Sequence, residues 1–306
     1  MSKKVKIFEV GLRDGLQYEK KTLSIEVRKR LALDLIDAGV QNLEIGAFVN
    51  PERVPQMIGT DKVVSGLIKQ QYNGKISMNT NFSALVPNEH GMMNAVGSGI
   101  NEVAVFTAAS KTFALKNINC TPKESLKRFA PVMRLAKKFK MRVRGYISTC
   151  FGCPFEGRVS EKQVVDMAER LFDLGVYELS IGDTIGVATP QQVKSLSFQL
   201  FRIAPTKKIA LHFHDTRGTA IANVLEGLDV GIRTFDSSIG GLGGCPFAKG
   251  AQGNVATEDV IYMLNGMGFE TGIDLKALIK INYKLQKILG HGLPAKLSKA
   301  GVPWWQ

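Results

Sequence analysis

Residues 209–223 read IALHFHDTRGTAIAN, and this stretch decides the fold because it joins a short apolar run to a helix-like segment. The run at 209–213 has the length of a buried strand. It also brings together His212 and His214, two of the chain's four histidines. Since residues i and i+2 of a strand point to the same face, the two imidazoles can lie side by side. They are either two hydrogen-bonded histidines of a sheet or half of a metal site.

The same strand-then-helix unit recurs along the chain. Amphipathic segments with helical spacing occur at residues 25–38, which stop at Gly39, and at residues 191–203, which follow Pro190. Eight such alternations predict an α/β fold, a (β/α)₈ TIM barrel, rather than a doubly wound sheet with fewer strands and a glycine fingerprint. The eight predicted strands are residues 5–10, 42–48, 75–80, 102–107, 142–148, 177–181, 209–213 and 234–239.

The length and composition fit a single large domain. The chain has 306 residues, of which 44% are hydrophobic, and no low-complexity linker interrupts it. One-domain α/β barrels commonly reach this size. We therefore expect one catalytic domain over residues 1–306, with a short C-terminal helical extension from about residue 282 to 306.

The charge balance narrows the class of partner. Forty Lys and Arg against 27 Asp and Glu give a net charge of +13, which suits nucleic acid, a membrane surface or an anionic small molecule. The sequence has no arginine-rich tract or zinc finger, so a nucleic-acid partner is not predicted. It also has no stretch of membrane-spanning length and no apolar signal core. With only four cysteines, we expect a soluble cytoplasmic protein.

Polar side chains collect where the predicted strands end. In a TIM barrel the active site lies at the carboxyl ends of the strands. Any one of these residues can be a helix cap or half of a salt bridge, but the whole set is better explained by an active site. These residues are Arg13, Asp14, Glu44, Tyr146, Asp183, His212, His214 and, in a glycine-rich loop, Cys245.

Several motifs resemble those of hydroxymethylglutaryl-CoA lyases, which are barrel metallolyases. They are VGLRDGLQ at 10–17, GDTIG at 182–186, GLGGCPFA at 241–248 and GNVATED at 253–259. The similarity runs from residue 8 to about residue 275. The cysteine loop at 241–248 is the specific part, because Arg-Asp-Gly and His-x-His are shared with related synthases and aldolases.

The resemblance implies a ligand set for a divalent metal ion. By position, the ligands are Asp14, His212, His214 and Asn254. A carboxylate, two imidazoles and an amide oxygen suit Mg²⁺ or Mn²⁺ and leave positions open for substrate. The absence of thiolate from this set argues against a closed structural zinc site.

The resemblance also implies an acyl-CoA substrate, 3-hydroxy-3-methylglutaryl-CoA, cleaved to acetoacetate and acetyl-CoA. Arg13 would stabilise the thioester enolate, and Glu44 would orient Arg13 or a bound water. Cys245 would protonate the enolate carbon. Either His212 or Asp183 would act as the base. The substrate-binding residues would be Arg13, Lys20, Tyr146 and Arg217, with Lys20 near the coenzyme A phosphates.

Four positions depart from the family pattern. Gly46 and Ala47 stand where threonine and serine are usual, Asn50 stands where serine is usual, and Arg217 stands where tyrosine is common. Two hydroxyls that could bind the substrate are therefore missing. A lyase for a related 3-hydroxyacyl-CoA, or a Claisen-type synthase or aldolase on the same barrel, remains an alternative. The sequence leaves the oligomeric state open, with a homodimer among the expectations.

Overall fold

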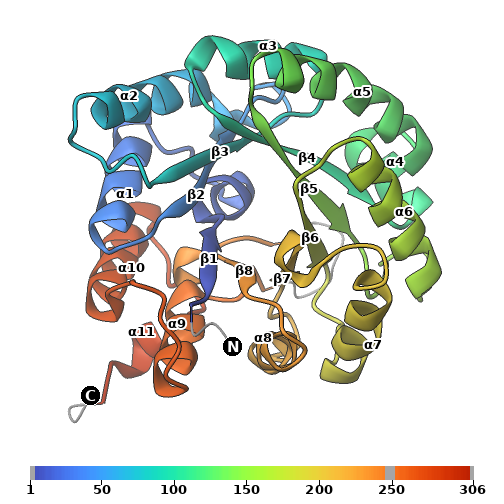
Figure 1. Ribbon diagram of the computed structural model, residues 1–306. Helices are drawn as coiled ribbons and strands as arrows, with labels where there is room; N and C mark the ends of the chain where they lie inside the picture. The colour runs from blue at the N-terminus through green and yellow to red at the C-terminus, as the bar shows by residue number, and fades with distance from the viewer. Residues whose placement is uncertain (1–3, 245–251, 304–306) are drawn as a thin grey trace.

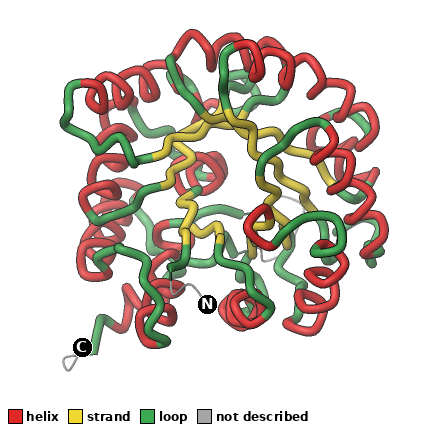
Figure 2. Tube along the Cα trace, viewed as in Figure 1, coloured by secondary structure: helices red, strands yellow, loops and turns green. Residues whose placement is uncertain are grey.

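The structure is a computed structural model that describes residues 4–244 and 252–303. Its centre is a closed barrel of eight parallel strands in sequential order, and the helices surround it (Figure 1, Figure 2). The predicted (β/α)₈ TIM barrel is therefore confirmed. The strands are β1 Lys6–Glu9, β2 Asn42–Ala47, β3 Asn81–Leu85, β4 Glu102–Ala108, β5 Arg142–Ser148, β6 Glu178–Asp183, β7 Ile209–Phe213 and β8 Thr234–Ser237.

The helices follow the strands in the chain and form the outer ring. The last two described helices, α10 and α11, come after the eighth strand and the helix that follows it. α10 packs beside α1 (Figure 1). Residue 282, where the sequence analysis begins the C-terminal extension, lies inside α10. The bounds are α1 Ile25–Asp37, α2 Thr60–Tyr72, α3 Glu89–Ser98, α4 Lys111–Ile118, α5 Pro122–Lys138, α6 Glu161–Asp173, α7 Pro190–Leu200, α8 Ala220–Asp229, α9 Thr257–Gly266, α10 Leu275–Leu289 and α11 Lys296–Ala300.

The first helix shows why the local sequence predicts its ends. The Ser24 side chain accepts a hydrogen bond from the Val27 N–H and caps α1. Gly39 then ends the segment with a φ of 96°. A Cβ on Gly39 would lie 2.1 Å from the Gly272 carbonyl oxygen, so both conformation and space require glycine there.

The predicted strand at residues 75–80 is wrong. These residues form the turn after α2, and the strand is β3, Asn81–Leu85. Only Ile76 of residues 75–78 is buried, whereas Phe82, Ser83 and Ala84 are all buried within the barrel wall. A strand of a parallel barrel is covered on both faces, so the continuously buried segment takes the place in the sheet.

Charged side chains occupy part of the barrel interior. Arg144 of β5 is fully buried, and its Nε lies 2.8 Å from Glu178 Oε1 while its Nη2 lies 2.7 Å from Asp236 Oδ1. Lys6 Nζ adds a contact of 2.5 Å to Glu178. Because each buried charge has an opposite partner, the barrel tolerates them. Across the described parts of the chain, none of the helices is both long enough and apolar enough to cross a membrane.

Candidate active site

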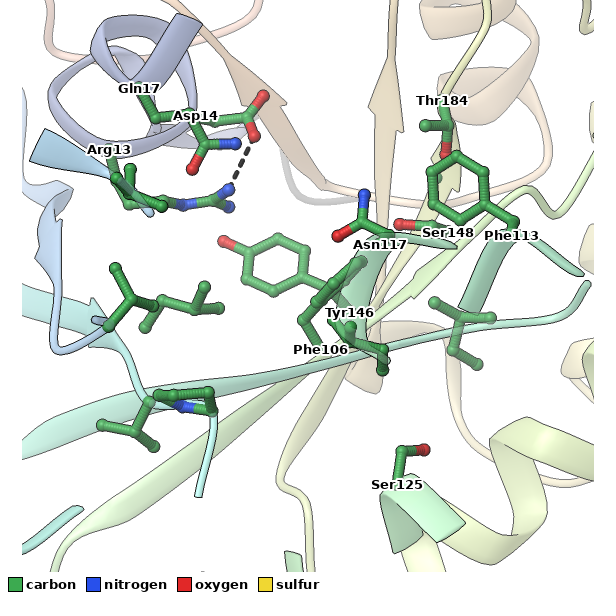
Figure 3. Close-up of a pocket in the computed structure, with 18 of the residues that line it drawn as sticks. Arg13, Asp14, Gln17, Phe106, Phe113, Asn117, Ser125, Tyr146, Ser148 and Thr184 are labelled. Atoms are coloured by element: carbon green, nitrogen blue, oxygen red, sulfur yellow. Dashed lines mark hydrogen bonds and ion pairs between the residues drawn. The ribbon is translucent and has the colours of Figure 1, made fainter. Parts of the chain in front are cut away.

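The turn after β1 supplies two charged residues. Arg13 and Asp14 lie on the five-residue π-helical turn Gly11–Gly15, and Arg13 Nη1 is 2.6 Å from Asp14 Oδ1 (Figure 3). Arg13 Nε also lies 2.7 Å from Glu44 Oε2 on β2. Burial alone would raise the pKa of Asp14, but Arg13, His212 and His214 outweigh burial and lower it. Asp14 is therefore a carboxylate at neutral pH.

Both histidines of β7 and its end face Asp14. The His212 and His214 ring centroids are 5.3 Å apart, and each Nε2 lies 3.9 Å from Asp14 Oδ2. These separations are too long for hydrogen bonds but suit ligand atoms arranged around one ion. Burial, together with His212, lowers the pKa of His214 to about 4, so its imidazole is neutral. Neutral imidazoles and a carboxylate are the forms that bind metal ions.

A buried carboxylate that sequence reasoning missed orients His212. Asp236 Oδ2 lies 3.3 Å from His212 Nδ1 and accepts a hydrogen bond of 2.6 Å from Ser180 Oγ. Burial opposes ionisation of Asp236, but Arg144 and His212 outweigh burial and lower its pKa. An ionised Asp236 accepts from Nδ1–H of His212, which leaves the Nε2 lone pair facing Asp14. The sequence hints at a role for Asp236 only by placing a carboxylate inside the short strand β8.

Asn254 reaches the same place from the loop before α9. Its backbone pairs with His214, and its Nδ2 donates to Asp14 Oδ2 at 2.8 Å and to the Leu242 carbonyl at 2.9 Å. The four implied metal ligands therefore lie together. In this arrangement the amide nitrogen of Asn254 faces Asp14, and a metal ion there would require the amide oxygen in its place.

A cavity of about 600 Å³ opens beside this cluster. Arg13, Asp14 and both histidines line it, and so does Tyr146, whose hydroxyl donates to Glu44 Oε2 at 3.1 Å. In Figure 3, Arg13 and Asp14 lie on one side of the cavity, and Phe113 and Ser125 lie on the other. The cavity is of the size that encloses a small organic ligand.

Three of the remaining candidates, Asp183, Arg217 and Lys20, are not among the residues that line the cavity. Both oxygens of Asp183 accept backbone N–H groups, from Val187 and Ala188 at 2.9 Å each, and burial raises its pKa to about 6. Arg217 Nη1 donates to the Ile185 and Gly186 carbonyls, at 2.9 and 3.0 Å. Lys20 is exposed. Cys245 lies outside the described residues.

The expectation that both Gly46 and Ala47 face the substrate is not met at Gly46. The pairing of β2 with β3 shifts register between Glu44 and Ala47. A Cβ on Gly46 would meet Thr60 Oγ1 at 2.7 Å and Arg28 Nη2 at 3.0 Å, on the helical side of the strand. A hydroxyl at position 46 would therefore face α1 and α2 and not the cavity.

Comparison with known proteins confirms the resemblance. The family model described as HMGL-like matches residues 4–284. The hydroxymethylglutaryl-CoA lyase of Pseudomonas mevalonii is 48% identical over 97% of this chain and 96% of that protein. The 3-hydroxy-3-isohexenylglutaryl-CoA/hydroxy-methylglutaryl-CoA lyase of Pseudomonas aeruginosa is 46% identical over 98% of each chain.

A solved structure agrees with both relatives. An HMG-CoA lyase from Acinetobacter baumannii, in complex with coenzyme A and 3-methylmalate, superposes with a TM-score of 0.92 and 36% identity, over 99% of this chain and 97% of that one. With the family model and these relatives covering nearly its whole length, this chain belongs to the hydroxymethylglutaryl-CoA lyase family.

Proposed function

We propose that this protein is a divalent-metal-dependent carbon–carbon lyase that cleaves 3-hydroxy-3-methylglutaryl-CoA into acetoacetate and acetyl-CoA. The observation that carries the proposal is one buried cluster, Asp14, His212 and His214, whose potential ligand atoms all lie within 4.8 Å of one another beside Arg13. A related aldolase or synthase reaction is disfavoured because the similarity to the lyases extends over nearly the whole chain.

Asp14, His212, His214 and Asn254 would hold the metal ion, which we propose to be Mg²⁺ or Mn²⁺. The donor set fits, because it offers one carboxylate, two imidazoles and one amide, with no thiolate. The Nδ1 of His214 has no hydrogen-bond partner among the described residues, so no competing contact fixes that ring. When bound, the ion lowers the pKa of the substrate's tertiary hydroxyl.

The reaction needs an acceptor for the hydroxyl proton, and two residues compete for this role. His212 lines the cavity, but its Nδ1 is engaged by Asp236 and its Nε2 faces Asp14. Asp183 has a pKa of about 6, suited to a general base near neutrality, but both its oxygens accept backbone N–H groups. The variants Asp183→Asn and His212→Gln, compared at equal metal occupancy, distinguish the two.

Arg13 is proposed to stabilise the negative charge that forms when the carbon–carbon bond breaks. The electron pair of that bond moves onto the thioester, and the enolate oxygen needs a fixed cation. Glu44 and Asp14 hold the Arg13 guanidinium from two directions, at 2.7 and 2.6 Å, which supports a preorganised cation. Cys245 is proposed to donate the final proton to the enolate carbon, and Gly244, the residue before it, lines the cavity.

We propose that the excess of basic residues serves to bind the phosphates of coenzyme A. The relative from Acinetobacter baumannii binds coenzyme A, and Lys20 is our proposed contact for its phosphates. Tyr146 is proposed to contact the acyl group, since its ring lines the cavity beside Arg13. The three described cysteines are all free, which supports our inference of a reducing, cytoplasmic location.

The deciding experiment incubates the protein with 3-hydroxy-3-methylglutaryl-CoA and either Mg²⁺ or Mn²⁺, and measures acetyl-CoA and acetoacetate. We expect both products in equal amounts, complete loss of turnover with excess chelator, and recovery when metal is restored. Cys245→Ala should lower kcat by about a hundredfold or more, the scale of a lost general acid. Turnover that survives chelation would refute the metal-dependent reaction, and turnover unchanged in Cys245→Ala would refute the role of the thiol.

A further inference from the structure

Glu9, the last residue of β1, carries a buried carboxyl group that the proposed mechanism does not use. Its side chain is 0% exposed, and β1 lies beside β8 in the barrel (Figure 1). The carboxylate accepts hydrogen bonds from the Gly11 N–H at 2.8 Å, the Ile239 N–H at 2.9 Å and the Thr257 hydroxyl at 2.6 Å. Because burial of an unpartnered carboxylate is costly, these three donors explain how the barrel tolerates it.

Two of the donors lie at opposite ends of one connection. We call residues 238–256, between β8 and α9, the β8–α9 connection. Ile239 is near its start, and Thr257 follows its end as the first residue of α9. The two ends also pair with each other. The Ser238 N–H donates to the Val255 carbonyl, and the Thr257 N–H donates to the Ser238 carbonyl, both at 3.0 Å.

The third donor belongs to the turn that follows β1. Gly11 begins the π-helical turn of residues 11–15, which carries the charged pair described above. Glu9 Oε1 accepts from both Gly11 and Ile239, so one oxygen atom bridges the turn and the β8–α9 connection. A Cβ on Gly11 would lie 2.6 Å from Glu9 Oε1 and 3.0 Å from Ser238 Oγ. The turn and the connection therefore approach too closely to admit a side chain at this position.

This bridge joins two segments that carry different parts of the proposed machinery. Asp14 is on the turn and Asn254 is in the β8–α9 connection, and their side chains meet at 2.8 Å although 240 residues separate them. Arg13, proposed to stabilise the enolate, is also on the turn, and Cys245, proposed to protonate it, belongs by sequence to the connection. Since no local sequence links the two segments, tertiary contacts must set their relative position.

We propose that Glu9 is a positioning residue, which fixes the turn after β1 against both ends of the β8–α9 connection and so keeps Asp14 in register with Asn254, and Arg13 in register with Cys245. This inference rests on the proposed function. Glu9 is not among the residues that line the cavity, so it acts through the groups that it holds. A misplacement of about 1 Å in such groups can lower a rate about a hundredfold.

The main variant is Glu9→Met, which removes both acceptor oxygens and keeps an unbranched side chain of similar length. Calorimetric titration with Mn²⁺ alone should show binding at least about tenfold weaker, the scale seen when a group that orients metal ligands is lost. At saturating Mn²⁺, kcat for 3-hydroxy-3-methylglutaryl-CoA should fall at least about tenfold, with KM within about threefold, because the misplaced proton donor acts on the chemical step.

Gln71→Met is the matched control. Gln71 is also a buried polar side chain that holds two backbone groups, since its Nε2 donates to the carbonyls of Ser77 at 2.9 Å and Thr80 at 2.8 Å. Those residues precede β3 and therefore lie at the end of the barrel opposite the active site. Gln71→Met should keep Mn²⁺ affinity and kcat within about twofold of the parent protein, whatever stability it loses.

A second pair of variants tests the same bridge if Glu9→Met does not fold, as judged by circular dichroism. Thr257→Val removes the hydroxyl that donates to Glu9 and keeps the shape of the side chain, so Mn²⁺ affinity and kcat should each fall about three- to tenfold, the scale of one lost hydrogen bond. Thr257→Ser keeps the hydroxyl and should restore both values to within about twofold of the parent.

The possible results separate a positioning role from a structural one. If Glu9→Met lowers only the free energy of unfolding, and the folded protein keeps the parent's Mn²⁺ affinity and kcat, the inference is overturned. Equal losses in Glu9→Met and Gln71→Met, or in the two Thr257 variants, overturn it as well. In each of these cases an active parent leaves the proposed function standing. A parent protein that neither binds Mn²⁺ nor cleaves the substrate refutes the proposed function, and the inference falls with it.

Discussion

At the residue scale, the function proposed for His212 depends on a side chain that no motif contains. Asp236 holds His212 Nδ1 at 3.3 Å and is itself held by Arg144 at 2.7 Å. A carboxylate behind a metal-binding histidine fixes the ring and the tautomer. The Arg144–Asp236–His212 chain therefore connects the charged interior of the barrel to the candidate metal ligands.

We expect Asp236→Asn to weaken Mn²⁺ binding about 10- to 100-fold, because the neutral amide no longer fixes the tautomer or increases the basicity of the His212 ring. Calorimetric titration with Mn²⁺ measures this, and circular dichroism checks the fold. Ser180→Ala is the control, since it removes only a hydroxyl that donates to Asp236. Its effect should be severalfold smaller. Equal affinity in Asp236→Asn and the parent protein would contradict the positioning role.

Arg13→Lys keeps the positive charge but loses the planar guanidinium that contacts Glu44 and Asp14 together. We expect kcat to fall about 10²- to 10³-fold, with Mn²⁺ affinity changed by less than about tenfold, since the lost interaction acts on the developing enolate. Steady-state kinetics and metal titration measure the two quantities. Arg53→Lys changes another cation that lines the cavity and should keep kcat within about threefold. A kcat as high as that of the control would exclude the proposed role of Arg13.

At the element scale, the sequence predicts most of the barrel because most strands are short apolar runs that end at a polar residue or glycine. β3 was missed because Asn81 and Ser83 interrupt its apolar pattern. Ser83 is nevertheless fully buried, and the Asn81 N–H donates to the Gln41 carbonyl, a tertiary pairing that no local pattern contains. Long-range contacts, not local preference, set this strand.

The same distinction separates the residues of the candidate site. The paired histidines are adjacent to each other along one strand, so their spacing indicates a shared face. Asp14 is a site candidate from its position after a predicted strand, but its role as a metal ligand, and Asn254 altogether, came only with the family resemblance, because 240 residues separate the two. Asp236 was missed for the same reason, as its partner Arg144 is 92 residues away. Local motifs predict which residue types act as ligands. The residues that position those ligands meet only when the barrel closes, so no local motif predicts them.

The register shift in β2 gives a prediction at this scale. Because a side chain at position 46 would crowd Thr60 and Arg28, Gly46→Thr should lower the free energy of unfolding by about 1–3 kcal/mol while leaving KM for the substrate within about twofold. Urea unfolding and steady-state kinetics measure these values. Ala47→Ser, on the neighbouring residue beyond the shift, is the matched comparison. A markedly lower KM in Gly46→Thr, with unchanged stability, would mean that position 46 does face the substrate.

At the scale of the whole molecule, one buried carboxyl group ties the barrel to the C-terminal helices. Glu258 of α9 accepts a hydrogen bond from the Gly240 N–H at 2.9 Å, one from Asn282 Nδ2 of α10 at 2.7 Å, and one from Ser298 Oγ of α11 at 3.2 Å. Gly240 follows β8 in the chain, so these bonds connect the last strand of the barrel to both later helices. Burial raises the pKa of Glu258 to about 7.

This raised pKa predicts how stability depends on pH. Between pH 4.5, the ordinary value, and about 7, the unfolded chain has released a proton that folded Glu258 still holds. The contribution of Glu258 is therefore fully present below pH 4.5 and is lost as the pH rises to 7, a change of about 3 kcal/mol. In the variant Glu258→Gln the side chain at position 258 cannot ionise, so its contribution to the pH dependence of stability is lost. The other ionisable groups are the same in both proteins.

Urea unfolding of the parent protein and of Glu258→Gln, at several values from about pH 4.5 to 7.5, isolates the effect. The parent's free energy of unfolding should fall relative to that of the variant by up to about 3 kcal/mol across this interval. The loss should saturate above pH 7, because Glu258 is then ionised in both the folded and the unfolded states. Two curves that stay parallel would show that the pKa of folded Glu258 is not raised above its ordinary value, and that a charged carboxylate holds the junction between the barrel and its C-terminal helices at neutral pH.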